Sequence, residues 1–187
     1  MNTTTNPDRP GQTRIPPPRI RVTLTPDEWA IAVSEGQLRQ LMAESLSRRP
    51  DWKDGTEKSG HVLGACGEAC WHKWRGIWWP VPLVDGFKKA DAVDNIQVRT
   101  TRKGFFKVKP EDDPAWIVVF VEADPDDEYS YYLVGAMRAG IAQTRYPLND
   151  PGNRGCPVHQ VPREDMGSIQ DLAAKLDGAK ATGMKEC

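Results

Sequence analysis

The sequence contains no apolar run long enough to cross a bilayer, and its first residues lack the basic start and apolar stretch of a signal peptide. We therefore expect a cytoplasmic protein, in which the four cysteines are free thiols rather than disulfides. The charge is also nearly balanced. A formal net charge of −1 gives no global attraction to nucleic acid, so any such site would be a local basic patch.

The chain length of 187 residues suits one domain with its own core. Residues 1–20 are polar and rich in proline, a composition that cannot bury a face, so we expect a disordered arm. Residues 177–187 are rich in glycine, alanine and lysine and indicate a flexible tail. The folded domain is then expected to occupy residues 21–176.

Two helices are predicted in the first half of this domain. Thr25-Pro26-Asp27-Glu28 forms a capping box with proline at the first helical position, and this helix should end near residues 48–50. Its apolar positions, which we expect to face the core, are Trp29, Val33, Leu38, Leu41 and Leu46. A second helix is predicted from Gly60 to Arg75, with Gly76 as its C-terminal stop.

Strand-like segments fill most of the second half. They cover residues 77–84, 95–101, 105–108, 116–122, 129–134 and 157–161. Residues 135–144 favour a short helix and residues 163–176 a final one. This succession predicts an α/β fold with a central mixed β-sheet flanked by helices.

The stretch around residues 89–101 contains the residues best suited to chemistry. Asp91 and Asp94 precede a strand on which Gln97 and Arg99 are two residues apart, so these two side chains project to the same face. An acid, an oxygen ligand and a nearby cation suit metal-dependent phosphodiester hydrolysis, in which Mg²⁺ polarises the phosphate. An ordinary amphipathic strand with solvated charges would give the same pattern.

This stretch and the helical run Gly64-Ala65-Cys66-Gly67-Glu68 resemble a phage-type branch of the PD-(D/E)XK nuclease-like superfamily. In that superfamily a helix-borne glutamate precedes a strand pair with the pattern D-(x)n-(E/Q)-x-K. The resemblance covers roughly residues 60–162. It implies a restriction-endonuclease-like core, DNA as substrate and Mg²⁺ or Mn²⁺ as cofactor. If the protein is encoded by a phage, the implied location is the cytoplasm of the host cell. It also implies a homodimer or a phage or host protein partner.

Carried over to this chain, the resemblance makes Glu68 and Asp91 the metal ligands, with Asp94 as the rival or third ligand. Gln97 takes the E/Q position, and Arg99 takes the lysine position, where it would bind phosphate and offset transition-state charge. The implied function is Mg²⁺-dependent hydrolysis of DNA phosphodiester bonds. Glutamine is a weaker ligand than a carboxylate, however, and arginine is no general base at neutral pH. The alternative is therefore a non-catalytic DNA-binding or protein-interaction module in phage replication, recombination or anti-defence.

Two further clusters have alternative interpretations. A basic rim surrounds the candidate site and would bind nucleic acid, unless it is a solvated hairpin face; it comprises Lys88, Lys89, Arg99, Arg102, Lys103, Lys107 and Lys109. Cys66 and Cys70 are four residues apart on one helical face, which could supply two zinc ligands. Because no second pair accompanies them, we expect buried thiols and no structural zinc.

Overall fold

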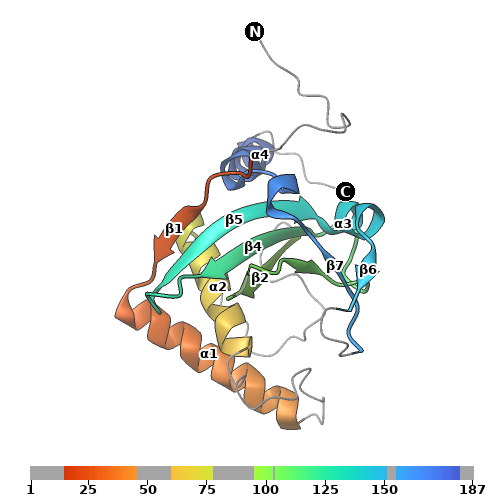
Figure 1. Ribbon diagram of the computed structural model, residues 1–187. Coiled ribbons are helices and arrows are strands. Elements are labelled where there is room, and N and C mark those ends of the chain that lie inside the picture. Colours follow the sequence, from red (N-terminus) through yellow and green to blue (C-terminus); the bar gives the residue numbers. More distant parts are fainter. Residues whose placement is uncertain (1–14, 46–59, 78–94, 103, 151–154, 182–187) are drawn as a thin grey trace.

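The computed structural model of the chain describes residues 15–45, 60–77, 95–102, 104–150 and 155–181. The fold is α/β, with a mixed four-stranded sheet, a second small sheet and flanking helices (Figure 1). None of the helices in these ranges has both the length and the apolar character needed to cross a bilayer. Asp91, Asp94, Lys88, Lys89 and Lys103 lie outside the described residues.

The main sheet has the strand order β1-β5-β4-β2, formed by Ile20–Thr23, Ser130–Arg138, Ile117–Ala123 and Ile96–Thr101. Strand β4 pairs in parallel with β2 and antiparallel with β5, which in turn pairs antiparallel with β1. Buried residues run almost continuously along β4 and β5, as expected for central strands covered on both faces.

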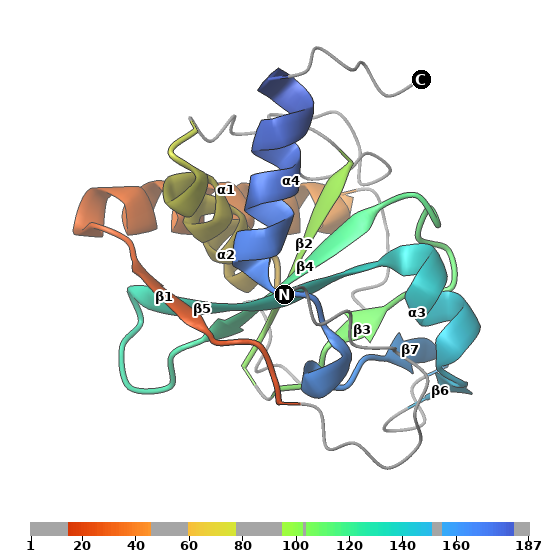
Figure 2. The same cartoon turned by 90° about the horizontal axis from the view of Figure 1, so that it is seen from above.

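One face of this sheet packs against helices. Helix α2 (Gly60–Arg75) lies directly on the strands, and its residues from Ala65 to His72 are all buried. Helix α1 (Pro26–Ser45) packs against α2, and α4 (Ile169–Ala181) lies on the same side of the sheet (Figure 2). Trp71 on α2 is fully buried in this core.

The opposite face packs against a small sheet and a short helix. The small sheet has the order β3-β7-β6, formed by Lys107–Val108, Val158–Gln160 and Leu148–Asn149. Helix α3 (Ala139–Arg145) and the 3₁₀ turn Arg163–Asp165 complete this side (Figure 2). The main sheet therefore has a helical layer on one face and a mixed layer on the other.

Local signals placed the start of α1 and the end of α2 correctly, whereas the predicted end of α1 near residues 48–50 lies outside the described residues. The Thr25 hydroxyl accepts a hydrogen bond from the Glu28 amide at 3.2 Å, and the Glu28 carboxylate accepts one from the Thr25 amide at 2.6 Å. This reciprocal pair confirms the predicted capping box. Helix α2 ends at Arg75 as predicted, because Gly76 adopts a left-handed φ of 64° that suits a helix stop.

The predicted inward face of α1 is confirmed in part: Trp29 and Val33 pack against the core, Leu38 and Leu41 do not, and Leu46 lies outside the described residues. Leu38 and Leu41 are exposed, and the buried residues of the helix are Ala32, Glu35 and Gly36. A Cβ atom at position 36 would lie 2.3 Å from the Cα of Val62, so glycine allows the two helix backbones to approach closely. The helix interface thus uses small residues rather than the leucines.

Five further elements differ from the sequence-based predictions. Strands β1 and β6 were not predicted, since both are short and β1 follows a proline-rich stretch. Strand β5 continues to Arg138, so helix α3 begins four residues later than expected. The final helix begins at Ile169 after a separate 3₁₀ turn and continues to Ala181.

Candidate functional site

Glu68 lies at the interface of α1 and α2, where Arg39 binds both of its carboxylate oxygens. The guanidinium nitrogens Nη1 and Nη2 donate to Oε1 and Oε2 at 2.7 and 2.8 Å. Glu68 is 3% exposed. A two-pronged pair of this kind is among the strongest and most directional ion pairs in proteins, and it occupies both oxygens that a metal would need.

A second carboxylate joins this pair from the preceding turn of α1. Glu35, also buried, accepts a hydrogen bond from Nε of Arg39 at 2.9 Å. Burial alone lowers the pKa of Arg39, but the hydrogen bonds and charges of Glu68 and Glu35 outweigh it and raise the pKa above its usual value. The three side chains together carry one excess negative charge, which the buried setting screens poorly.

Gln97 and Arg99 share one face of β2, as the two-residue spacing predicted. Their pairing partners on β4 are Val118 and Phe120, whose side chains belong to the core on the side of the small sheet. Residues Ile96 and Val98 point the other way, into the core that contains α2. The structure therefore brings Gln97 and Arg99 together but places Glu68 on the opposite face of the sheet.

Arg99 is held by an acid that the sequence analysis did not single out. Its Nη2 donates to Oδ1 of Asp112 at 2.6 Å, and Oδ2 of Asp112 accepts from the Lys109 amide at 2.8 Å. Asp112 is 5% exposed, and Gln143 donates to its carbonyl oxygen at 2.8 Å. Asp112 thus fixes both Arg99 and the loop after β3.

Acidic side chains neutralise part of the positive charge of the basic rim, as far as the structure describes it. Arg99 is paired with Asp112, and Lys109 lies 3.7 Å from Glu111. Arg102 is exposed and Lys107 is half-buried on β3, so both remain on the surface of this region. The local field is therefore weaker than the sequence count of lysines and arginines suggests.

The described residues do not assemble the metal site that the resemblance implies. No group of three or more His, Cys, Asp or Glu side chains that could hold a metal ion occurs within the described ranges. Glu68 cannot enter one metal shell with Gln97, because the sheet separates them and Arg39 uses both oxygens of Glu68. Asp91 and Asp94, the other expected ligands, lie outside the described residues.

The cysteines of α2 are buried free thiols, as predicted. Burial raises the pKa of both Cys66 and Cys70, which disfavours the thiolate form that binds metal. His72, on the same helix, donates from Nδ1 to the Glu68 carbonyl oxygen at 2.9 Å, while its Nε2 is buried without a hydrogen-bond partner. These groups belong to the helix–sheet core.

Three charged residues of this region were not identified from the sequence: Glu35, Arg39 and Asp112. Arg39 follows Glu35 by four residues, a spacing that signals a helical ion pair, but nothing local indicates its contact with α2. Asp112 lies in an acidic loop between two strands, and its partner Arg99 is 13 residues away.

No known protein family, no curated protein and no solved structure matches this chain.

Proposed function

We propose that the chain is a protein-interaction module of nuclease-like architecture that does not cleave DNA. The observation that carries this proposal is the pair between Arg39 and Glu68. Both oxygens of the glutamate that the resemblance assigns to metal binding are occupied by a guanidinium. Freeing them would break a two-pronged ion pair with a buried carboxylate, at a cost on the order of 3–5 kcal/mol, and would leave Arg39 its contact with Glu35.

The position of Arg99 supports the same proposal. A transition-state cation must be free to approach phosphate, whereas Arg99 is bound to the buried Asp112 on the face away from Glu68. Its Nε is buried and makes no hydrogen bond. We interpret Arg99 as a structural cation that ties β2 to the loop after β3.

Charge favours a protein partner over DNA. Binding to DNA depends on cations that neutralise phosphates, and its strength grows with their number. Arg19, Arg99 and Lys109 are each matched by an acid, at 3.0, 2.6 and 3.7 Å. The formal net charge of the whole chain is −1. An interaction with protein makes no comparable demand for unpaired cations.

Mg²⁺-dependent cleavage of DNA is the second candidate function. It is favoured by the shared face of Gln97 and Arg99, which begins directly after the two aspartates of the sequence motif. In that case Asp91 or Asp94 would bind the metal, without Glu68.

The two candidates differ in a cleavage assay. Supercoiled plasmid and single-stranded DNA are incubated with the folded protein and Mg²⁺ or Mn²⁺, alongside the variants Asp91→Ala and Asp94→Ala. We expect no cutting by any form and no specific uptake of either metal in calorimetry. Metal-dependent cutting by the wild type that disappears in Asp91→Ala would overturn the proposal and establish the nuclease.

A further inference from the structure

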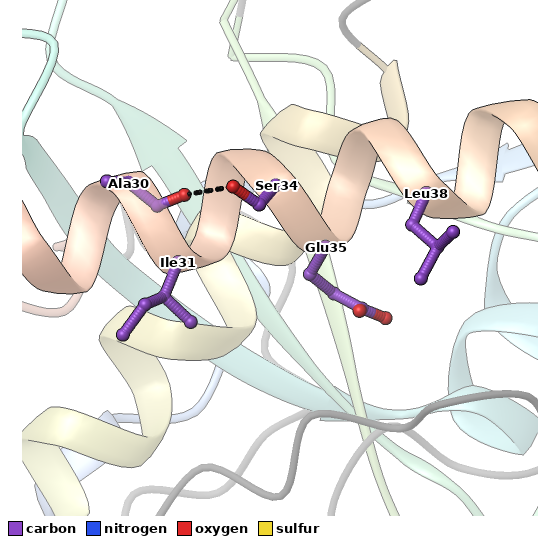
Figure 3. Close-up of a pocket in the computed structure, with 5 residues that line it drawn as sticks. All are labelled: Ala30, Ile31, Ser34, Glu35 and Leu38. Carbon is purple, nitrogen blue, oxygen red and sulfur yellow. Dashed lines mark hydrogen bonds between the residues drawn. The ribbon is translucent and has the colours of Figure 1, made fainter.

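The hollow on the outer side of α1 offers a ligand little besides apolar surface. It has a volume of about 370 Å³, and the residues that line it all belong to α1: Ala30, Ile31, Ser34, Glu35 and Leu38. The Ser34 hydroxyl donates to the Ala30 carbonyl oxygen at 2.8 Å (Figure 3), and Glu35 is bound by Arg39. Nothing in the described part of the chain indicates what would cover this hollow.

A second hollow, of about 290 Å³, lies where β4 turns into β5, and a charged group already occupies its edge. That group is the guanidinium of Arg19, the residue directly before β1. It lies over the ring of Tyr132, with its Cζ atom 4.5 Å from the ring centroid. Its Nη1 donates to Oε2 of Glu122 at 3.0 Å. An aromatic face beside a carboxylate is well suited to bind a flat, charged guanidinium.

The receiving half of this contact is fixed without Arg19. Tyr132 and Glu122 lie opposite each other on the paired strands β5 and β4. The Tyr132 hydroxyl donates to Oδ2 of Asp124 at 3.1 Å, and Oδ1 of Asp124 accepts from the Asp126 amide at 3.1 Å. The side chain of Asp124 is 7% exposed. The ring and the carboxylate therefore stay in place when the guanidinium leaves, which is the preorganisation that a binding site needs.

Arg19 can leave the pocket at small cost. Its side chain is 41% exposed, and exposed ion pairs and cation–π contacts are weak. The backbone on either side of it is held separately. The carbonyl oxygen of the buried Pro17 accepts from Arg163 at 3.1 Å, and Ile20 pairs with Leu133 in the sheet. Only the side chain of Arg19 therefore has to rotate away.

The pocket that remains without this guanidinium is anionic. Its acidic groups and those beside it are Glu122, Asp124, Asp126 and Asp127, and its arginines are Arg19, Arg21 and Arg102. Four negative charges against three positive charges leave an excess of one, which becomes two when Arg19 leaves. The vacated pocket thus attracts a cation rather than an anion.

We propose that the pocket of Tyr132 and Glu122 is a recognition site for an arginine side chain of a partner protein, and that Arg19 is an intramolecular substitute that fills it until the partner binds. The partner's guanidinium stacks on Tyr132 and pairs with Glu122 in place of Arg19. A lysine would supply the charge but not the flat stacking contact. This inference rests on the proposed function and names the partner chemistry of the interaction module.

The test is an NMR titration of the full chain with two blocked tripeptides, one with arginine and one with citrulline between two glycines. Citrulline has the shape of arginine without its charge. Arg19→Ala empties the pocket. Arg138→Ala is the matched control, because Arg138 is an exposed arginine at the other end of β5. Tyr132→Leu and Glu122→Gln, each combined with Arg19→Ala, remove one half of the receiving site.

Arg19→Ala should bind the arginine peptide about tenfold more tightly than the wild type, because the internal competitor is gone. Arg138→Ala should bind it as the wild type does. Adding Tyr132→Leu or Glu122→Gln to Arg19→Ala should weaken binding about tenfold, and so should replacing arginine by citrulline in the peptide. The amide signals that shift should belong to the hairpin of β4 and β5. Circular dichroism of each variant confirms that it is folded.

Arg19→Ala that binds no peptide, or binds it only as tightly as the wild type, would show that Arg19 is a structural strap and would overturn the proposal. Equal affinity for the citrulline peptide, or an equal gain with Arg138→Ala, would overturn it as well. A wild-type dimer in light scattering that Arg19→Ala dissociates would replace the partner protein by a second copy of the chain. Failure of the proposed function is distinguishable, because it appears as metal-dependent DNA cleavage, whereas this titration contains neither DNA nor metal.

Discussion

Gly67 on α2 faces the hydroxyl of Thr100 on β2 so closely that a Cβ atom at position 67 would lie 1.9 Å from Oγ1 of Thr100. The Cβ and Cγ2 atoms of Thr100 would also be within 3.2 Å of it. The absence of a side chain at position 67 therefore sets how closely the helix carrying Glu68 approaches the strand carrying Gln97 and Arg99.

Gly67→Ala should lower the free energy of unfolding by about 1–3 kcal/mol, because the overpacking outweighs the gain in helix propensity of about 1 kcal/mol. Gly64→Ala on the same helix is the matched control. Nothing lies within 4 Å of a Cβ atom at position 64, so this variant should be as stable as the wild type or more so. Urea denaturation of both variants, and of Gly67→Ala combined with Thr100→Ala, measures the effect. Equal stability of the two single variants would contradict the close contact.

Arg39→Met should destabilise the fold by about 3–5 kcal/mol, because it leaves two buried carboxylates without their partner. Arg39→Lys should recover only part of this loss, since a lysine cannot bind both oxygens of Glu68 in the same way. Lys73→Met serves as the control: it breaks the more exposed pair with Glu28 and should change stability by less than about 1 kcal/mol. If the losses of Arg39→Met and Lys73→Met were similar, the Arg39 pair would not be the buried contact described above.

Lowering the pH should lower the free energy of unfolding, because His72 becomes protonated. Burial lowers the pKa of His72, and its neutral form already donates from Nδ1 to a carbonyl oxygen, so protonation would place an unpaired N–H at Nε2 in the core. The unfolded chain binds this proton below a pH of about 6.5, whereas the folded chain does not. Stability is therefore full above that pH and falls below it, by up to about 1.4 kcal/mol per pH unit. The free energy of unfolding between about pH 7.5 and 5.5 measures this loss, and the slope should be shallower in His72→Gln. Identical slopes would contradict the prediction.

Thiol labelling should distinguish the exposed cysteine from the buried ones by their rates of modification. Cys156 is exposed, whereas Cys66 and Cys70 are buried and have raised pKa values. In a Cys187→Ser background, a thiol reagent at mild pH should modify Cys156 rapidly and leave the two α2 cysteines intact until the chain is unfolded. Mass spectrometry of tryptic peptides identifies the labelled positions. Rapid labelling of Cys66 in the folded protein would show that α2 separates from the sheet.

The parts of this fold that depend on neighbouring residues could be predicted from the sequence. The capping box at Thr25 and the glycine stop at Gly76 act within one helical turn, so each could be identified without knowing the rest of the fold. The shared face of Gln97 and Arg99 likewise follows from the geometry of a single strand.

The parts of the fold that depend on partners distant in sequence could not be predicted. Helix α1 has large apolar residues on more than one side, and nothing local indicates that Trp29 and Val33 pack against the core, that Leu38 and Leu41 stay exposed, or that α2 approaches closely at Gly36. The order of Glu68, Gln97 and Arg99 along the sequence does not specify on which face of the sheet each side chain lies. Arg39 is 29 residues from Glu68, and no local pattern links the two.

The pairing of β1 with β5 has a consequence for how the chain folds during its synthesis. Thr23 and Ser130 are neighbours in the sheet but 107 residues apart in sequence. Strand β1 therefore leaves the ribosome long before its partner exists, while α1 and α2 can pair as soon as both have emerged. Among the strands that the structure describes, β1 is thus made early but placed late, because closing the long loop to β5 is entropically costly.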